Sequence, residues 1–90
     1  MSIIKKRASA GTMESSDVYV ELEPSEDGNR ISLQSAVLGQ FGDSIRASVE
    51  DVLAKFNVQN AKLNIIDQGA LDCVLRARVE TAIRRGKEDA

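Results

Sequence analysis

The sequence predicts an α+β domain, in which a small, mainly antiparallel sheet of three or four strands has two helices on one face. Three short runs alternate between apolar and polar residues, which is the period of a half-buried strand. Two longer runs place apolar residues three and four positions apart, which is the period of an amphipathic helix. The runs follow one another in the order β-β-α-β-α, and this order favours a two-layer sandwich.

The N-terminal part of the chain supplies most of the predicted strands. Residues 1–7 are basic and are expected to form a flexible arm, and a short extra strand is compatible with residues 8–12. Residues 18–22 and 31–34 alternate, and the Pro, Asp and Gly residues between them are typical of a turn. We therefore expect these two strands to pair as an antiparallel hairpin with a rather long loop.

Two helices and a third strand are expected in the rest of the chain. Ser35 is suited to cap the first helix, whose apolar stripe consists of Phe41, Ile45, Val49, Val52, Leu53 and Phe56. Residues 61–66 alternate, with Ala61, Leu63 and Ile65 expected to face inward. The second helix is expected over about residues 70–85, with a stripe formed by Leu71, Val74, Leu75, Val79, Ala82 and Ile83. Residues 86–90 are polar and are predicted to be a frayed tail.

Length and composition restrict the function. The chain has 90 residues, which is the size of one domain with little room for an enclosed substrate pocket. Its composition, 42% hydrophobic and 29% charged, is typical of a soluble domain. A net charge of −2 and only 3% aromatic residues argue against nucleic-acid binding. No stretch has the length of a membrane span, and no apolar stretch follows the basic start as in a secretory signal. The chain has no histidine, so we expect neither a metal site nor a catalyst acting alone.

The stretch from Gly11 to Asp17 is the main candidate for function. Ser15 and Ser16 lie between Glu14 and Asp17, just ahead of the first clearly alternating strand. Ser and Asp side chains hydrogen-bond to their own backbone and favour turns, which is sufficient by itself to explain the pattern. A hydroxyl at the mouth of a strand is also held in place and open to a second macromolecule. Such a position suits the attachment of a covalent group.

Three blocks of the chain resemble the family of citrate lyase acyl carrier proteins. Residues 11–18 (GTMESSDV) are similar to the modification-site motif of that family. Residues 40–46 (QFGDSIR) resemble the start of its first helix, and residues 67–78 (DQGALDCVLRAR) resemble its most distinctive block. The blocks occur in the family's order, and the resemblance runs from about residue 8 to about residue 84. Three motifs in order are far more specific than any one of them.

The resemblance implies a non-catalytic acyl carrier subunit. Ser15 falls at the family's modified serine, which bears a phosphoribosyl-dephospho-coenzyme A group through a phosphodiester bond, whereas Ser16 falls where glycine is common. The group holds acetyl and citryl thioesters for the alpha (transferase) and beta (lyase) subunits of cytoplasmic citrate lyase, which cleave citrate to oxaloacetate and acetate. A dedicated transferase installs the group, so recombinant chain made without that enzyme is expected to lack it. The alternative is a small adaptor subunit of a cytoplasmic complex, with no covalent cofactor.

Four charged residues are candidates for partner recognition. Glu14 and Asp17 belong to a segment, residues 14–27, that contains six acids and no base. They either stabilise a turn in solvent or meet a basic surface of a partner. Arg76 and Arg78 either form a solvated basic face, or hold the phosphates of the cofactor, or dock on an acidic partner.

Cys73 is the only thiol of the chain and therefore a conceivable acyl acceptor. It lies off the apolar stripe of the second helix, and no histidine is present to activate it. Because cysteine behaves as a small apolar residue, we favour a packing role for it.

Overall fold

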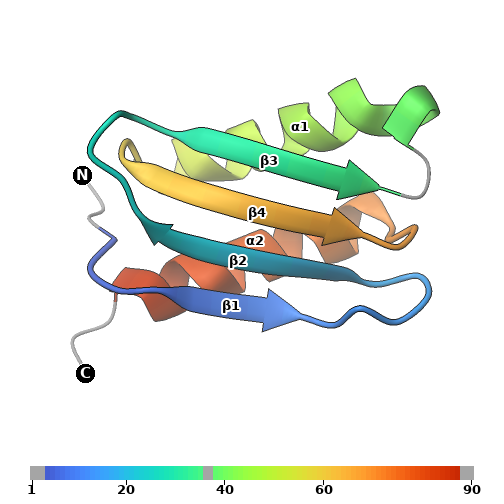
Figure 1. The fold of residues 1–90 in the computed structure, drawn as a ribbon, viewed down its shortest axis with the longest axis horizontal. Coiled ribbons are helices and arrows are strands. Elements are labelled where there is room, and N and C mark those ends of the chain that lie inside the picture. The colour runs from blue at the N-terminus through green and yellow to red at the C-terminus, as the bar shows by residue number, and fades with distance from the viewer. Residues whose placement is uncertain (1–3, 36–37, 88–90) are drawn as a thin grey trace.

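In residues 4–35 and 38–87, which the computed structural model describes, four strands form one sheet and two helices cover one face of it (Figure 1). The elements are β1 (Ala8–Gly11), β2 (Val18–Pro24), β3 (Arg30–Ser35), α1 (Leu38–Lys55), β4 (Ala61–Asp67) and α2 (Asp72–Lys87). The sheet order is β1-β2-β4-β3, in which β2 runs antiparallel to β1 and β4, while β3 runs parallel to β4. The expected α+β sandwich is confirmed, and the extra N-terminal strand is present as β1.

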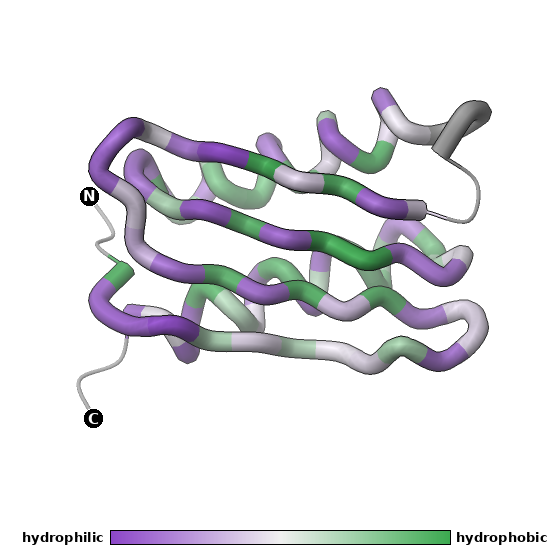
Figure 2. The backbone as a smooth tube through the Cα atoms, viewed as in Figure 1, coloured by the Kyte–Doolittle hydropathy of each residue, from purple (hydrophilic) through white to green (hydrophobic). Residues whose placement is uncertain are grey.

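The core lies between the sheet and the two helices. Val18, Val20 and Leu22 of β2 and Leu63 and Ile65 of β4 are 0–1% exposed, and hydrophilic residues alternate with them along the strands (Figure 2). The helices contribute a second set of buried side chains, which comprises Val49, Val52, Leu53, Leu75, Val79, Ala82 and Ile83. Each fully buried side chain of this size contributes about 1.5–3 kcal/mol of transfer free energy, so the two apolar stripes are sufficient to hold the layers together.

The predicted hairpin between residues 18–22 and 31–34 is wrong, because β4 lies between β2 and β3. The loop between β2 and β3 is held across the start of β4 by two asparagines. The Asn29 side chain donates to the Val58 carbonyl and accepts from the Ala61 amide, and the Asn60 side chain accepts from the Gly28 amide. β3 then pairs with β4 through the α1 crossover. Alternation in a sequence indicates which face of a strand is buried, but not which strand lies beside it.

Two predicted positions near the helix starts are also wrong. Ser35 is the last residue of β3 rather than a helix cap, and its hydroxyl donates to Asp67 at 2.8 Å. Leu71 precedes α2 and is 71% exposed, because the amides of Val74 and Leu75 bond to its carbonyl and make it the residue that caps the helix. A residue at this cap has a non-helical backbone, so its side chain leaves the apolar stripe. The side chain of Phe41 lies outside the part of the chain that is described.

Parts of the predicted arm and tail belong to the folded domain. Ile4 is buried, and the amides of Lys5 and Lys6 donate to the carbonyl of Gly86 at 2.8 and 3.1 Å. Gly86 and Lys87 are the last residues of α2, not part of a frayed tail. A Cβ at Gly86 would lie 2.5 Å from the side chain of Leu22, so this position packs closely against the sheet. Residues 1–3 and 88–90 lie outside the described ranges.

Candidate functional site

The turn between β1 and β2 places Ser15 at one end of the molecule (Figure 1). The Asp17 amide donates to the Glu14 carbonyl at 3.1 Å and closes a four-residue turn with Ser15 and Ser16 at its centre. Ser16 has a φ of +65°, which is the third-position conformation of a type II turn. Ser15 is exposed, and its hydroxyl forms no hydrogen bond with any residue that the structure describes. This oxygen is therefore open to a reagent or a second protein.

Asp17 organises the turn from within. Its carboxylate accepts hydrogen bonds from the Thr12 hydroxyl and from the Val18 amide, each at 2.7 Å. The Thr12 hydroxyl in turn accepts from the Glu14 amide at 3.2 Å. Both ends of the turn and its interior are thus fixed by one carboxylate and one hydroxyl, which are the short side chains that favour turns.

Arg78 of α2 connects the turn to the helix layer. Its Nε and Nη2 atoms donate to the two carboxylate oxygens of Asp17 at 3.1 and 3.0 Å, in the bidentate geometry that gives arginine–carboxylate pairs their directionality. The side chain of Asp17 is only 15% exposed in this pair. The pKa of Asp17 is lowered from 3.8 to about 2, first by Arg78 and then by the bonds from Thr12 and Val18. Asp17 is therefore ionised at neutral pH, and its charge is balanced inside the molecule.

The loop after β4 supports the turn from the other side. The Ser16 amide donates to the Gln68 carbonyl at 2.8 Å, and the Gln68 amide donates to the Asp17 carbonyl at 2.9 Å. Asp67, which is 4% exposed, anchors this loop because it accepts from the Ser35 hydroxyl and from the Ala70 amide. The turn that carries Ser15 is thus held to β4 and to α2, and its backbone position is determined by both.

Gly11 is required where the chain leaves β1 for the turn. It has a φ of +91°, and a Cβ at this position would lie 1.8 Å from the carbonyl oxygen of Val18. Any side chain at this position would collide with the neighbouring strand. The same Cβ would also lie only 3.3 Å from the Cδ atom of Arg78, the residue that binds Asp17. Sequence reasoning included Gly11 in the motif without this reason, and it missed the structural roles of Thr12 and Gln68, which both lie inside the matched blocks.

The four predicted recognition residues fall into two separate groups. Glu14 is exposed and forms no ion pair with another described residue, whereas Asp17 and Arg78 bind each other. Arg76 contacts the helix layer instead, with Asp72 at 2.8 Å and with Asp51 of α1. The pKa of Asp51 is lowered chiefly by the hydrogen bond from Arg76, and the pKa of Asp72 is lowered chiefly by the hydrogen bond from Ser48. The structure thus places Arg78 beside the Ser15 turn and uses Arg76 to join α1 to α2.

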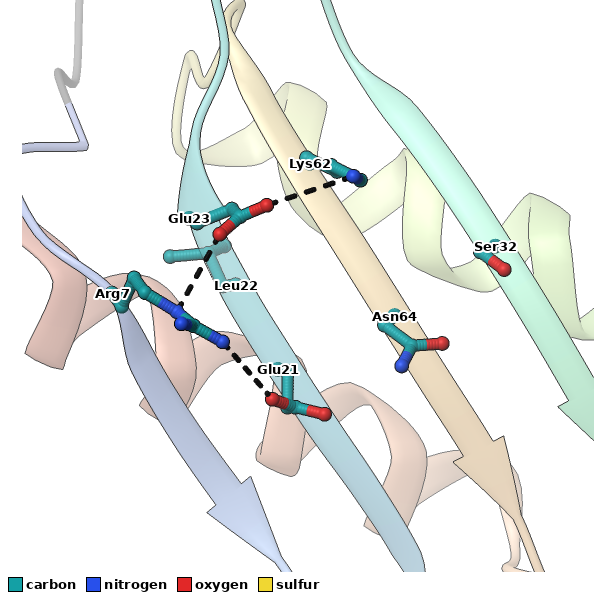
Figure 3. A pocket seen from close by; sticks show the side chains of 7 residues that line it. All are labelled: Arg7, Glu21, Leu22, Glu23, Ser32, Lys62 and Asn64. Carbon is teal, nitrogen blue, oxygen red and sulfur yellow. Dashed lines mark ion pairs between the residues drawn. The ribbon is translucent and has the colours of Figure 1, made fainter.

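Of the other four acids of the predicted acidic segment, two lie in the loop between β2 and β3, and two lie on the open face of the sheet (Figure 3). Glu21 and Glu23 border a hollow of about 410 Å³ there, and both are ion-paired with Arg7 at 3.5 Å (Figure 3). Lys62 of β4 adds a contact to Glu23 at 3.7 Å (Figure 3). These pairs are between partly exposed groups, so they contribute little to stability, but they balance the negative charge of this face locally.

Cys73 does not have the packing role that we favoured, because it is exposed near the start of α2. Within residues 4–35 and 38–87, no group of three or more His, Cys, Asp or Glu side chains is arranged to hold a metal ion. Neither of the helices described is long and apolar enough to cross a membrane.

Comparisons with known proteins identify the family. The family model described as malonate decarboxylase delta subunit matches residues 5–86. A citrate lyase acyl carrier protein of Treponema denticola is 51% identical over 85 residues, which cover 94% of this chain and 97% of that protein. One from Latilactobacillus sakei is 48% identical over 88 residues and covers 96% of this chain and 87% of that protein.

A solved structure supports the same fold. One chain of a Pseudomonas malonate decarboxylase hetero-tetramer in complex with malonate superposes with a TM-score of 0.77, at 24% identity. The match covers 93% of this chain and 87% of that chain, and at this identity it shows the fold alone. Identity near 50% over almost the whole length shows more than the fold. The chain therefore belongs to the family of citrate lyase acyl carrier proteins, whose role is to carry an acyl group rather than to catalyse.

Proposed function

We propose that Ser15 bears a phosphoribosyl-dephospho-coenzyme A group and that the chain presents acyl thioesters on it to the other subunits of citrate lyase. The observation that carries this proposal is the exposed, unbonded Ser15 hydroxyl at the centre of a turn whose backbone is fixed on both sides. A covalent carrier needs a modified atom that other proteins can reach, on a support that does not move.

The residues present fit this group. Attachment forms one bond between Ser15 Oγ and phosphorus and breaks one phosphoanhydride bond of the donor, whose outer phosphate portion leaves as an anion, while the hydroxyl proton passes to a base. We assign that base to the transferase, since the chain contains no histidine and the Asp17 carboxylate is bound by Arg78. When bound, the group supplies the thiol on which acetyl and citryl are held as thioesters. Ser15 contributes the anchoring oxygen, and Asp17 and Arg78 keep the anchoring backbone in place.

The partners follow from this assignment. The alpha subunit exchanges acetyl for citryl on the carrier, and the beta subunit cleaves the citryl carrier to oxaloacetate and acetyl carrier. This chain makes none of those bonds and moves the thioester between the two sites. We place the complex in the cytoplasm, where citrate lyase acts.

Transfer of a labelled cofactor precursor in the presence of the transferase tests the proposal. We expect Ser15→Ala to remain folded and unlabelled, because no other hydroxyl occupies this position of the turn. Ser16→Gly is the matched control, since it removes the neighbouring hydroxyl and keeps the left-handed backbone; it should be labelled as the wild type is. A Ser15→Ala chain that is labelled, or a wild-type chain that never is, contradicts the proposal, and the latter result favours an adaptor without a cofactor.

A further inference from the structure

Two large apolar side chains are exposed among the residues that the structure describes, and both belong to the segments that meet beside Ser15. Met13 is 54% exposed and lies in the turn itself, two residues before the serine. Leu71 is 71% exposed and lies in the loop after β4. The hydrogen bonds from the Ser16 amide to the Gln68 carbonyl and from the Gln68 amide to the Asp17 carbonyl join the two segments. Single exposed apolar residues are ordinary on a protein surface, but their concentration at one functional end is not.

The apolar surface at this end continues beyond Leu71. Leu71 borders a hollow of about 350 Å³, whose apolar lining also includes Ala70, Ile45 of α1 and Leu75 of α2. The hollow therefore opens beside the loop that supports the Ser15 turn. Apolar recesses of this kind accept apolar side chains of a partner and bury them together with their own rim.

The charges near the serine offer much less to a partner. Asp17 is bound to Arg78 through two hydrogen bonds, and Glu21 is paired with Arg7 on the open face of the sheet. Glu14 is the acid of the turn that has no ion pair among the described residues. Balanced charges steer an approaching protein weakly, so the acidic segment is a poor source of binding energy at this end.

The size of a protein footprint determines what covers Met13 and Leu71. The Cα atoms extend over 34 × 22 × 18 Å along the principal axes, and the Ser15 turn lies at one end of the longest axis (Figure 1). A specific interface covers about 800 Å² on each partner, which is larger than the 22 by 18 Å cross-section spanned by the Cα atoms alone. A protein that docks around Ser15 Oγ is therefore expected to reach the neighbouring surface of this end, where Met13 and Leu71 are exposed.

We propose that the protein that modifies Ser15 recognises this end mainly through apolar contacts with Met13 and Leu71, not through the acidic segment. The proposal rests on the proposed function, because it takes the modifying transferase as the occupant. The transferase then has an apolar recess beside its catalytic site. Its binding to the carrier is insensitive to salt, since apolar burial is not screened by ions.

Steady-state label transfer by the transferase, at low and at high salt, tests this inference. Met13→Ser and Leu71→Ser should each raise KM for the carrier about tenfold, at both salt concentrations, since each removes an apolar contact that is buried only in the complex. kcat should stay unchanged, because Ser15 and its turn are intact. Leu71→Met keeps a large apolar side chain and should have a wild-type KM, and Glu14→Gln should change KM little.

Ala54→Ser is the matched control, since Ala54 is exposed on the last turn of α1, away from the Ser15 end. It should leave KM unchanged. Wild-type KM values for Met13→Ser and Leu71→Ser, with wild-type chain labelled on Ser15, overturn the docking inference and leave the proposed function standing. A large, salt-dependent rise in KM for Glu14→Gln overturns it in favour of charge recognition. Failure to label wild-type Ser15 at all removes the proposed function as well.

Discussion

At the scale of single residues, the two adjacent serines of the turn have the same chemistry but different backbones. Ser16 has a φ of +65°, a region that residues with a Cβ avoid, whereas Ser15 is not among the residues with positive φ. This difference gives a physical reason why glycine would suit the position of Ser16. Ser16 serves the shape of the turn, and Ser15 offers its hydroxyl.

Substitutions of Ser16 should therefore act on stability rather than on chemistry. A non-glycine residue in this conformation is strained by about 1–3 kcal/mol, and substitution by glycine removes that strain. Glycine also gives the unfolded chain more freedom, which offsets about 0.5–1 kcal/mol of the stabilisation. We expect Ser16→Gly to raise the free energy of unfolding by about 0.5–1 kcal/mol, whereas Ser16→Val should lower it, because a β-branched side chain is a severe outlier at positive φ. Urea unfolding of the three proteins measures both effects, and a Ser16→Gly chain less stable than the wild type contradicts the assigned turn.

At the scale of structural elements, the ion pair between Asp17 and Arg78 joins the β1–β2 turn to α2. Sequence reasoning placed both residues on a recognition surface, yet their charged groups are directed at each other. Neutralising Asp17 therefore does more than remove a surface charge, since it releases the bonds from Thr12 and Val18 as well. Any test of acidic recognition has to use Glu14 alone.

Loss of Arg78 should loosen the turn without unfolding the domain. Arg78→Met keeps the aliphatic stem and removes both hydrogen bonds to Asp17, so the amides of Ser16 and Gln68 should exchange faster with solvent. A reacting group displaced by about 1 Å loses up to a hundredfold in rate, and we expect modification of Ser15 to slow by about 10- to 100-fold through kcat. Arg76→Met is the matched control, because it disrupts the contact between the helices and should not change exchange at the turn. Unchanged exchange at Ser16 in Arg78→Met shows that the pair does not position the serine.

The same pair predicts a dependence of stability on acid. Because the pKa of Asp17 is lowered in the folded state, its contribution to stability is present above pH 4 and is lost as the pH falls toward 2. Asp17→Asn lacks that contribution at every pH, so its unfolding free energy should fall less than that of the wild type between pH 4 and 2. Denaturant unfolding at several pH values measures this. An equal fall of the unfolding free energy in the two proteins across this pH window contradicts the assigned ion pair.

Element positions were largely predictable from the sequence, but the pairing of elements was not. The alternation of Val18, Val20 and Leu22 and the spacing of Val49, Val52 and Leu53 identify faces, since they follow the strand and helix periods. β4 lies between β2 and β3 through pairings with strands far away in the sequence, and Asn29 and Asn60 add hydrogen bonds across 29 and 32 residues, which no local pattern encodes. The candidate site shows the same limit. The motif makes Ser15 the candidate, whereas the residues that support its turn, Thr12, Gln68 and Arg78, meet only in the folded chain.

At the scale of the whole molecule, the candidate serine lies away from both faces of the sheet. One face of the sheet is covered by helices, the other carries balanced charges, and the turn with Ser15 lies at one end of the long axis (Figure 1). Under the proposed function the carrier enters the sites of its partner subunits in turn, and a serine at a narrow end can enter where a flat face cannot. The fold suits a protein that delivers a group and leaves the chemistry to its partners.

The central claim, that Ser15 carries a covalent group, is tested most directly by the mass of the chain produced together with the transferase. Trypsin cleaves after Arg7 and Arg30, so Ser15 lies in the peptide of residues 8–30. We expect a single adduct on the intact chain, located in this peptide and assigned to Ser15 by fragmentation, and no adduct on chain produced without the transferase. An unmodified chain from cells with active transferase, or an adduct that fragmentation assigns to another residue, would contradict the account.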